Sequence, residues 1–337
     1  MKFLRKFNEH TSYEAEVNVG GQDFEIPNVS YCKDVDDVHF NPYNLIEFYV
    51  DEITGTTPQT VKIYTDATNH LDVEVSKGNK WYSYLLPKDK GLSKIEGDSV
   101  KKLVVKADIN KIRSTTIIPS STVEASFKGS NTSNVTNMES MFSGCTHLTS
   151  LDVSSLETSN VTDMGSMFDS CINLTSLDLS NFNTSNVTNM KYMFYLCSGL
   201  TFLDVSNFDT SNVTSMNLIF DGCGGLATLD VSNFNTSKVI GMNYMFYGCS
   251  GLTSLDLSNF KTSKVTTMSQ TFRNCSKLTS LNLSGWDMSN VTNMRSMFYG
   301  CSKLNTIRMK GCSEATINKI KTQLTTDGIT GAQITTE

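Results

Sequence analysis

The sequence has no run of 18 or more apolar residues, so it contains no candidate for a membrane-spanning helix. Its N-terminus, MKFLRKFNEHTSYEAEV, begins with basic residues but has no apolar stretch after them, and we therefore expect no secretory signal peptide. Histidine is scarce, with only 4 residues, and none stands at the spacing of a metal site or a catalytic triad. The sequence thus predicts a protein that is not an enzyme and has no cofactor or bound metal.

Positive charge is also limited. The chain has 28 Lys and Arg residues against 34 Asp and Glu residues, which gives a net charge of −6. The basic residues are scattered, whereas a nucleic-acid partner requires them to be concentrated on one face. We therefore expect no nucleic-acid partner and no insertion into a membrane.

One unit of 26 residues is repeated seven times between Thr132 and Lys310. Its clearest copies read TSNVTNMKYMFYLCSGLTFLDVSNFD and TSKVIGMNYMFYGCSGLTSLDLSNFK. The cysteine that marks each copy recurs without insertion or deletion as Cys145, Cys171, Cys197, Cys223, Cys249, Cys275 and Cys301. Each copy must therefore be one closed turn of chain, and the turns must stack into a solenoid.

Each repeat contains two apolar patterns. VxxMxxMF has three- and four-residue spacing, which predicts a short helix or a run of helical turns, and LxxLxL ends in the alternation of a strand. Strands in successive copies would pair in parallel, about 4.8 Å apart. The fold class predicted for this region is an α/β repeat solenoid, with a parallel β-sheet and short helical turns.

The pattern MFxxCxxLxxLDLSxFxTSxVTxM resembles the BspA-like leucine-rich repeats of bacterial surface proteins. The resemblance covers residues 131–310, more than half of the chain. It implies a curved leucine-rich-repeat-like solenoid, with the LxxLxL strands on one side and the Met/Phe segments on the other. For function it implies adhesion or recognition at a surface, without catalysis.

The remaining sequence predicts the other parts of the chain. Residues 1–106 hold short β-branched or aromatic segments separated by turn residues, which indicates a small, mainly antiparallel β domain acting as an attachment module. Residues 107–130 are expected to cap the solenoid, which occupies 131–312. Residues 313–337 are expected to form a helical cap that begins at Ser313 and ends at Gly328. Solenoids require such caps at both ends.

The N-terminal segment, with its charged MKFLRKFNEH beginning followed by PNVSYC and VHFNP, resembles virion-associated proteins from phages of gut Bacteroidales. The resemblance spans about forty residues. It implies that the N-terminal module docks onto other virion proteins while the solenoid points outward. It would also account for a surface-type repeat without an export signal, because a phage protein is released by lysis.

Two columns of residues recur at fixed places. The seven repeat cysteines are expected to form a ladder of buried thiols, since a ladder neither closes a zinc tetrahedron nor pairs completely as disulfides. A column of carboxylates is formed by Asp152, Asp178, Asp204, Asp230 and Asp256, and is continued by Asn282 and Arg308. Repulsion between these carboxylates must be compensated by nearby serine hydroxyl groups and backbone N–H groups or, alternatively, by Ca²⁺.

Variable positions are where a partner could be recognised. The candidates for ligand binding around the Met/Phe segment are Tyr192, Tyr195, Tyr244, Tyr247, Tyr299, Arg273 and Arg295, with Phe202 as the candidate on the strand face. Tyr195, Tyr247 and Tyr299 take the same position in every second repeat, so they should lie on one side. Exposed Tyr and Arg are favoured in recognition surfaces. The alternative is that the tyrosines only cover the edge of the helical turns.

These observations lead to three hypotheses. The first is a recognition protein on a phage particle, in the tail or decorating the capsid, whose solenoid contacts a protein or glycan of the bacterial surface. The second is a bacterial cell-surface adhesin, and the third is a structural spacer that binds no ligand. The first places the chain in the virion and the second at the cell surface. A homo-oligomer is compatible with each of them.

Overall fold

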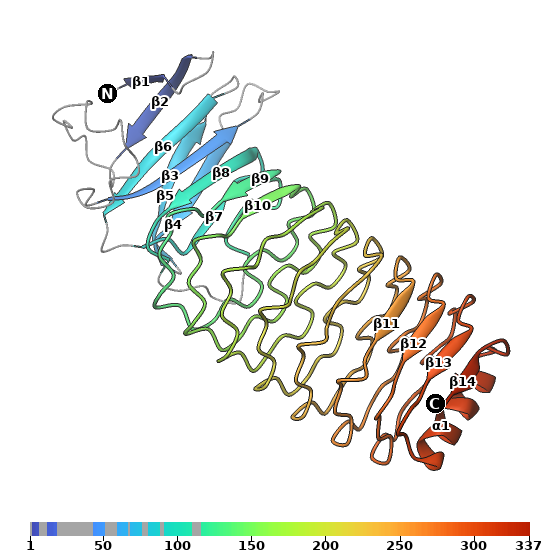
Figure 1. Ribbon diagram of the computed structural model, residues 1–337. Helices are drawn as coiled ribbons and strands as arrows, with labels where there is room; N and C mark the ends of the chain where they lie inside the picture. The colour runs from blue at the N-terminus through green and yellow to red at the C-terminus, as the bar shows by residue number, and fades with distance from the viewer. Residues whose placement is uncertain are drawn as a thin grey trace.

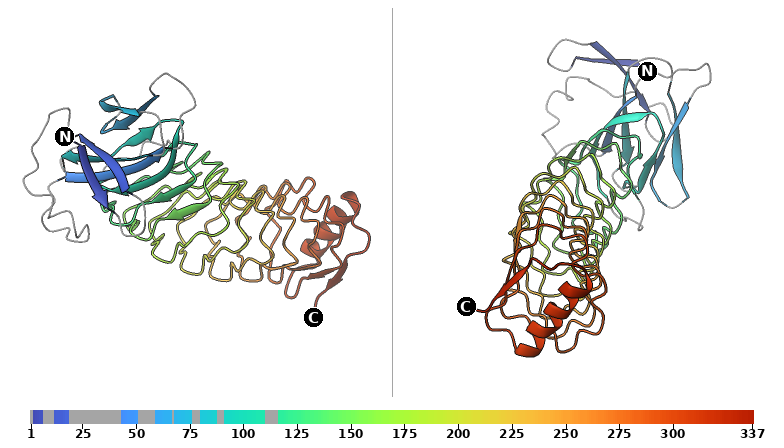
Figure 2. Two further views of the ribbon diagram at one scale, coloured as in Figure 1. Left: turned by 90° about the horizontal axis from the view of Figure 1, so that it is seen from above. Right: turned by 90° about the vertical axis from the view of Figure 1, so that its right-hand side faces the viewer.

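The computed structural model describes residues 2–6, 12–18, 43–50, 59–66, 68–75, 80–87, 91–109 and 116–337. The molecule is elongated, with β-sheets at the N-terminal end, a stack of coils in the middle and a helix at the C-terminal end (Figure 1). Views from two further directions show the coils stacked along one axis (Figure 2). The segments PNVSYC and VHFNP lie outside the described residues.

Two sheets form the N-terminal end. The larger contains, in order, β1 (Lys2–Lys6), β2 (Ser12–Asn18), β6 (Lys80–Pro87), β3 (Tyr43–Val50) and β8 (Val100–Lys106), and the smaller contains β5 (His70–Val75), β4 (Gln59–Tyr64) and β7 (Lys94–Glu96). All of these pairs are antiparallel except β2 with β6. Buried residues of both sheets, such as Phe48 and Ile63, belong to the same hydrophobic core as the solenoid.

The larger sheet runs directly into the solenoid. Strand β8 pairs in parallel with β9 (Glu124–Ser126), which pairs in parallel with β10 (Ser150–Asp152). Leu103, Ala125 and Leu151 therefore stand in one column. The N-terminal sheet thus covers the first open end of the solenoid. The division of the chain at residues 106 and 130 remains a prediction, because β8 serves both parts.

The coils confirm the predicted fold class, a repeat solenoid with a parallel sheet behind a small, mainly antiparallel β region. Further strands β11 (Ser254–Asp256), β12 (Ser280–Asn282), β13 (Thr306–Arg308) and β14 (Gln333–Thr335) pair in parallel. Inside, the phenylalanine three residues before each cysteine stacks on its equivalent in the next coil, with ring centroids 5.6–5.8 Å apart. One continuous apolar column therefore runs through the coils.

The VxxMxxMF segment is not a helix, so of the two predicted forms only the run of turns is observed. The N–H of Met138 donates to the carbonyl of Asp163 in the next coil at 2.8 Å, and Phe142 donates in the same way to Met167 at 2.9 Å. The residue five before each cysteine is left-handed in all seven coils, with φ between 53° and 61°. These inter-coil bonds and left-handed residues interrupt the i→i−4 pattern that a helix requires.

The C-terminal end is covered by helix α1 (Glu314–Thr326). Its N-cap is Ser313, whose hydroxyl group accepts a hydrogen bond from the N–H of Thr316 at 3.2 Å. Ile320 and Leu324 are buried against the last coil. After Gly328, strand β14 adds one more rung to the sheet.

Candidate functional site

The tyrosines of the repeats lie on the outer side of the Met/Phe wall, two or five residues before the cysteine of their coil. We call these the −2 and −5 positions. Tyr192 and Tyr299 are exposed, and Tyr195, Tyr244 and Tyr247 are half-buried. Two contacts join them within a coil: Tyr192 and Tyr195 lie edge to face with centroids 5.7 Å apart, and Tyr244 and Tyr247 lie tilted at the same distance. Together with the −2 residues of the intervening and following coils they form the tyrosine face, which we define as Tyr192, Tyr195, Asp221, Tyr244, Tyr247, Arg273 and Tyr299.

Two members of the tyrosine face have an unfavourable backbone conformation. Tyr192 has φ of 61° and Tyr244 has φ of 57°, in the left-handed region that bulky residues rarely adopt. The fold imposes this conformation at the −5 position of every coil, where four coils carry Ser or Gln. A tyrosine there is a poor choice for stability. Its side chain, which at Tyr192 is 39 % exposed, is therefore a candidate for function.

This strain predicts the effect of Tyr192→Asn. Asparagine tolerates the left-handed conformation better than tyrosine, so we expect the free energy of unfolding to stay unchanged or rise by up to about 1 kcal/mol. Urea denaturation measures the change. The control is Tyr195→Asn, because Tyr195 does not have a positive φ and the loss of its packing should lower stability. A clear loss of stability in Tyr192→Asn would show that the strain is negligible.

Asp221 belongs to the same face and was not among the residues singled out from the sequence. It takes the −2 position between Tyr195 and Tyr247 of the adjacent coils, and it is only 5 % exposed. Among the described residues, no hydrogen bond reaches its carboxylate, and its backbone carbonyl accepts from Leu196 N–H at 2.7 Å. Burial raises the pKa of Asp221 to about 7. The centre of the face therefore holds a carboxyl group without a partner.

Arginine takes the equivalent position further along the column. The guanidinium carbon of Arg273 lies 4.6 Å from the ring centroid of Tyr299 in the next coil, as in a cation–π pair. The Nε atom of Arg273 is buried and has no hydrogen-bond partner within the described structure. Neighbouring amides also contact the tyrosines, since Asn274 Nδ2 donates to the hydroxyl group of Tyr247 at 3.3 Å and Gln270 donates to that of Tyr244.

The other two predicted residues do not join this cluster. Phe202 is 65 % exposed on the strand wall, as the pattern predicted, but it belongs to a different wall of the coil. Arg295 is exposed at the edge of the Met/Phe wall, and its backbone N–H donates to the side chain of Asn293 at 3.1 Å. The structure therefore brings together the five tyrosines, Arg273 and Asp221.

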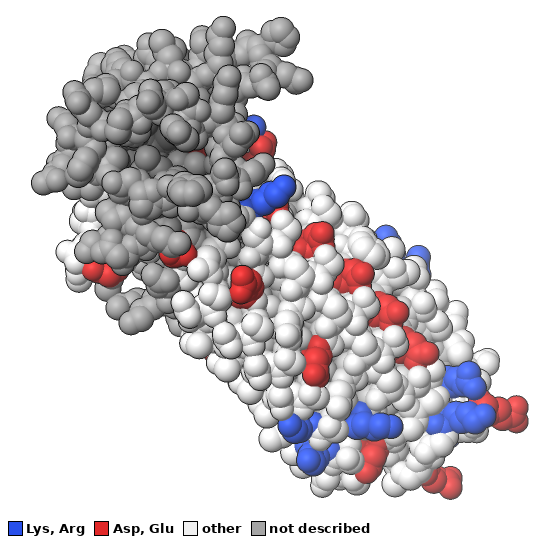
Figure 3. Space-filling model, turned by 60° about the vertical axis from the view of Figure 1, so that its left-hand side comes forward, with Lys and Arg blue, Asp and Glu red and all other residues white. Residues whose placement is uncertain are grey.

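The aspartate column lies along the strand wall, where Figure 3 shows a row of acidic side chains following the solenoid axis. Each carboxylate accepts a hydrogen bond from the N–H of the serine two residues later; for Asp204 the donor is Ser206 at 2.9 Å. These bonds hold the pKa of Asp204 below its usual value. Hydrogen bonding therefore compensates the repulsion. Within the described ranges, no three His, Cys, Asp or Glu side chains are placed to hold a metal ion.

This arrangement predicts that the aspartate column does not depend on calcium. Because its carboxylates already accept hydrogen bonds from backbone N–H groups, we expect the melting temperature to be the same in EDTA and in millimolar CaCl₂. Differential scanning calorimetry measures it, with MgCl₂ as the ionic-strength control. A rise that occurs only with Ca²⁺ would contradict this assignment.

The seven repeat cysteines are free and buried. From the second coil on, each thiol donates to the carbonyl of the phenylalanine in the preceding coil; Cys223 Sγ lies 3.1 Å from Phe194 O. Burial raises the pKa of the Cys171 thiol to about 12. The column thus consists of unreactive thiols that join coil to coil.

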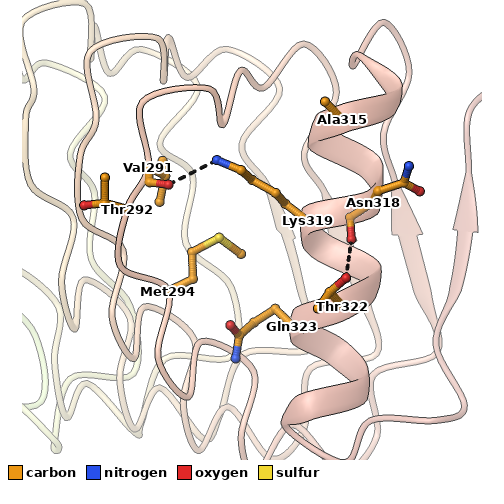
Figure 4. Close-up of a pocket in the computed structure, with 8 residues that line it drawn as sticks. All are labelled: Val291, Thr292, Met294, Ala315, Asn318, Lys319, Thr322 and Gln323. Atoms are coloured by element: carbon orange, nitrogen blue, oxygen red, sulfur yellow. Dashed lines mark hydrogen bonds between the residues drawn. The ribbon is translucent and has the colours of Figure 1, made fainter.

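A shallow cleft of about 460 Å³ separates α1 from the last coil (Figure 4). Lys319 reaches across it and donates to the carbonyls of Met288 at 2.7 Å and Val291 at 3.1 Å. Lys319 thus links helix α1 to the last coil through these hydrogen bonds. We assign this cleft to the attachment of the cap.

Comparison with known families assigns the repeats. Residues 114–223 and 197–311 match the family described as "Mycoplasma protein of unknown function, DUF285". No curated protein shows a significant match to the chain. In the described part of the chain, no helix is long and apolar enough to cross a membrane. The matched region is the solenoid, including the tyrosine face, and it is consistent with BspA-like surface repeats. Since the match spans more than half of the 337 residues, the chain belongs to the DUF285 family.

Proposed function

We propose that the chain is a non-enzymatic recognition or adhesion protein that contacts a bacterial surface through the tyrosine face. The observation that carries this proposal is the combination of two strained tyrosines, the exposed Tyr192 and the half-buried Tyr244, with the buried carboxylate of Asp221, which accepts no hydrogen bond within the described structure, on one wall of the solenoid. A spacer without a ligand has no use for either feature. Membership of a family with surface-type repeats supports the same function.

Attachment of the purified, fluorescently labelled chain to whole bacterial cells tests this proposal. We expect Tyr195→Ser with Tyr247→Ser to reduce attachment at least tenfold, since aromatic anchors dominate binding energy at interfaces. The matched control is Phe202→Ser, on the strand wall. Equal attachment of the natural chain and the double variant would overturn the proposal, and a chain that attaches to no cells would favour the spacer.

The finer proposal places the protein on a phage particle, in the tail or on the capsid, with its N-terminal module docked onto other virion proteins. The resemblance of residues 1–42 to virion-associated proteins supports it, and most of that segment lies outside the described residues. Mass spectrometry of purified particles beside washed host membranes tests it. Stoichiometric peptides in the particles are expected. Peptides in the membranes alone would favour the bacterial adhesin instead.

A further inference from the structure

The residues at the −2 positions of successive coils form a column, and in this column one cationic side chain already contacts a tyrosine ring. Arg273 stands one coil before Tyr299, and its guanidinium group lies over that ring at 4.6 Å. Asp221 stands one coil before Tyr247 in the same way. Because aspartate is much shorter than arginine, it does not cover the next ring as Arg273 does.

The carboxylate of Asp221 indicates that a group bound beside Tyr247 would carry a positive charge. It is 5 % exposed, and within the described structure it accepts no hydrogen bond, whereas the carboxylates of the strand wall are each bonded to serine. An uncompensated buried carboxylate is unfavourable unless it is protonated or paired with a cation. A cation placed above Tyr247 would meet both the ring and this carboxylate.

We infer that Asp221 and Tyr247 form a binding site for the arginine side chain of a partner protein. This inference rests on the proposed recognition function and specifies its partner. Arginine fits because its planar guanidinium stacks on an aromatic ring and donates two parallel hydrogen bonds to a carboxylate. The net charge of −6 favours the approach of a basic partner.

A related pair occurs two coils earlier. Asp169 precedes Tyr195 by one coil, but it is half-buried and already accepts a hydrogen bond from the hydroxyl group of Ser170 at 2.7 Å. The two sites are about 10 Å apart if coils are spaced by about 4.8 Å. This distance matches residues i and i+3 of a polyproline II segment, which rises about 3.1 Å per residue and returns to the same face every third residue. An extended partner with two arginines three positions apart would therefore occupy both sites.

Fluorescence anisotropy of the full chain with a labelled six-residue peptide that carries two arginines three positions apart tests the inference. We expect Asp221→Asn to weaken binding at least tenfold, Tyr247→Ala to weaken it similarly and Tyr247→Phe to preserve it. Replacing the arginines of the peptide by neutral citrulline should abolish binding. The control Asp204→Asn should leave it unchanged. Equal affinity in Asp221→Asn, or for the citrulline peptide, would overturn the inference.

The pH dependence gives an independent measurement. Tyr195, Tyr247, Cys223 and Cys249 surround Asp221, and Asp169 and Arg273 lie two coils away along the column. Phenols and thiols ordinarily titrate above pH 8. Of the groups at this site, Asp221 is therefore the one expected to change its charge between pH 6 and pH 8. Binding of the peptide should strengthen about tenfold over this range, since each pH unit below the pKa reduces the ionised fraction about tenfold. Binding of the natural chain that does not change with pH would overturn the inference.

Whole-cell attachment separates this inference from the proposed function. If Asp221→Asn attaches normally while Tyr195→Ser with Tyr247→Ser does not, the tyrosine face is functional but the arginine site is wrong. If the peptide binds as described but the natural chain attaches to no cells, the arginine site is supported and the proposed surface function fails.

Discussion

Phe220→Ala is expected to lower the free energy of unfolding by about 3–5 kcal/mol, the usual loss when a large buried aromatic residue is truncated. Phe220 is fully buried, and its ring lies 5.8 Å from those of Phe194 and Phe246 in the adjacent coils and 6.3 Å from that of Phe234. The stacked backbones hold the coils apart, so the cavity cannot collapse. Urea denaturation followed by circular dichroism measures the loss.

The control for this variant is Phe202→Ala. Phe202 is 65 % exposed on the strand wall, so its removal should change stability by no more than about 0.5 kcal/mol. If both variants lost the same stability, the phenylalanine column would not be the structural core. A Phe220→Ala chain as stable as the natural one would also show that the phenylalanine column is not the structural core.

Asp221→Asn is expected to raise stability at pH 8 by roughly 2–4 kcal/mol and to leave it unchanged near pH 3.5, on the relation of about 1.4 kcal/mol per pKa unit. The folded protein holds the pKa of Asp221 at about 7, whereas the ordinary pKa of an aspartate side chain is 3.8. Between these values the folded state binds more protons than the unfolded state, so stability falls as the pH rises. Above pH 7 the loss is complete, and asparagine avoids it.

The matched control is Asp204→Asn, for which the expected change in stability at pH 8 has the opposite sign. Hydrogen bonds from Ser206 lower the pKa of Asp204, so this carboxylate contributes stability above its unfolded pKa, and that contribution is lost as the pH falls through the lowered value. Asp204→Asn should therefore be slightly less stable than the natural chain at pH 8 and should approach it in acid. Urea denaturation from pH 3.5 to pH 8 measures both variants. Parallel pH profiles for the natural chain and Asp221→Asn would contradict the assignment.

The stacking of the coils could be predicted because every residue that stabilises it recurs at a fixed interval. The constant spacing of Cys145, Cys171 and the later cysteines determines the length of a coil, and the apolar positions around them determine which side chains face inward. The aspartate column could also be placed, since Asp152 alternates with the inward Leu151 and Val153.

The conformation of the Met/Phe wall could not be predicted in the same way. Its three- and four-residue spacing is shared by a helix and by a run of turns. The left-handed −5 position is occupied by residues such as Ser140, Tyr192 and Gln270, which do not signal a positive φ. Glycine gives such a signal at the position before the cysteine, as in Gly144 and Gly222, and only some coils carry it.

Asp221 could not be identified from its own coil, because the tyrosines at the equivalent position of the adjacent coils, Tyr195 and Tyr247, are 26 residues away on either side. In the sequence it resembles Asp169, which stands at the same −2 position but accepts a hydrogen bond from Ser170. The available signal was the alternation along this column of Tyr195, Asp221 and Tyr247.

Photo-cross-linking tests most directly which wall of the solenoid contacts a surface. A benzophenone amino acid would replace Tyr299, which is 51 % exposed on the tyrosine face, or Phe202, which is 65 % exposed on the strand wall. Each labelled chain is irradiated on whole bacterial cells, and covalent adducts are detected by gel electrophoresis. If the tyrosine face is the recognition surface, position 299 gives adducts and position 202 gives few. Adducts from position 202 alone would contradict it.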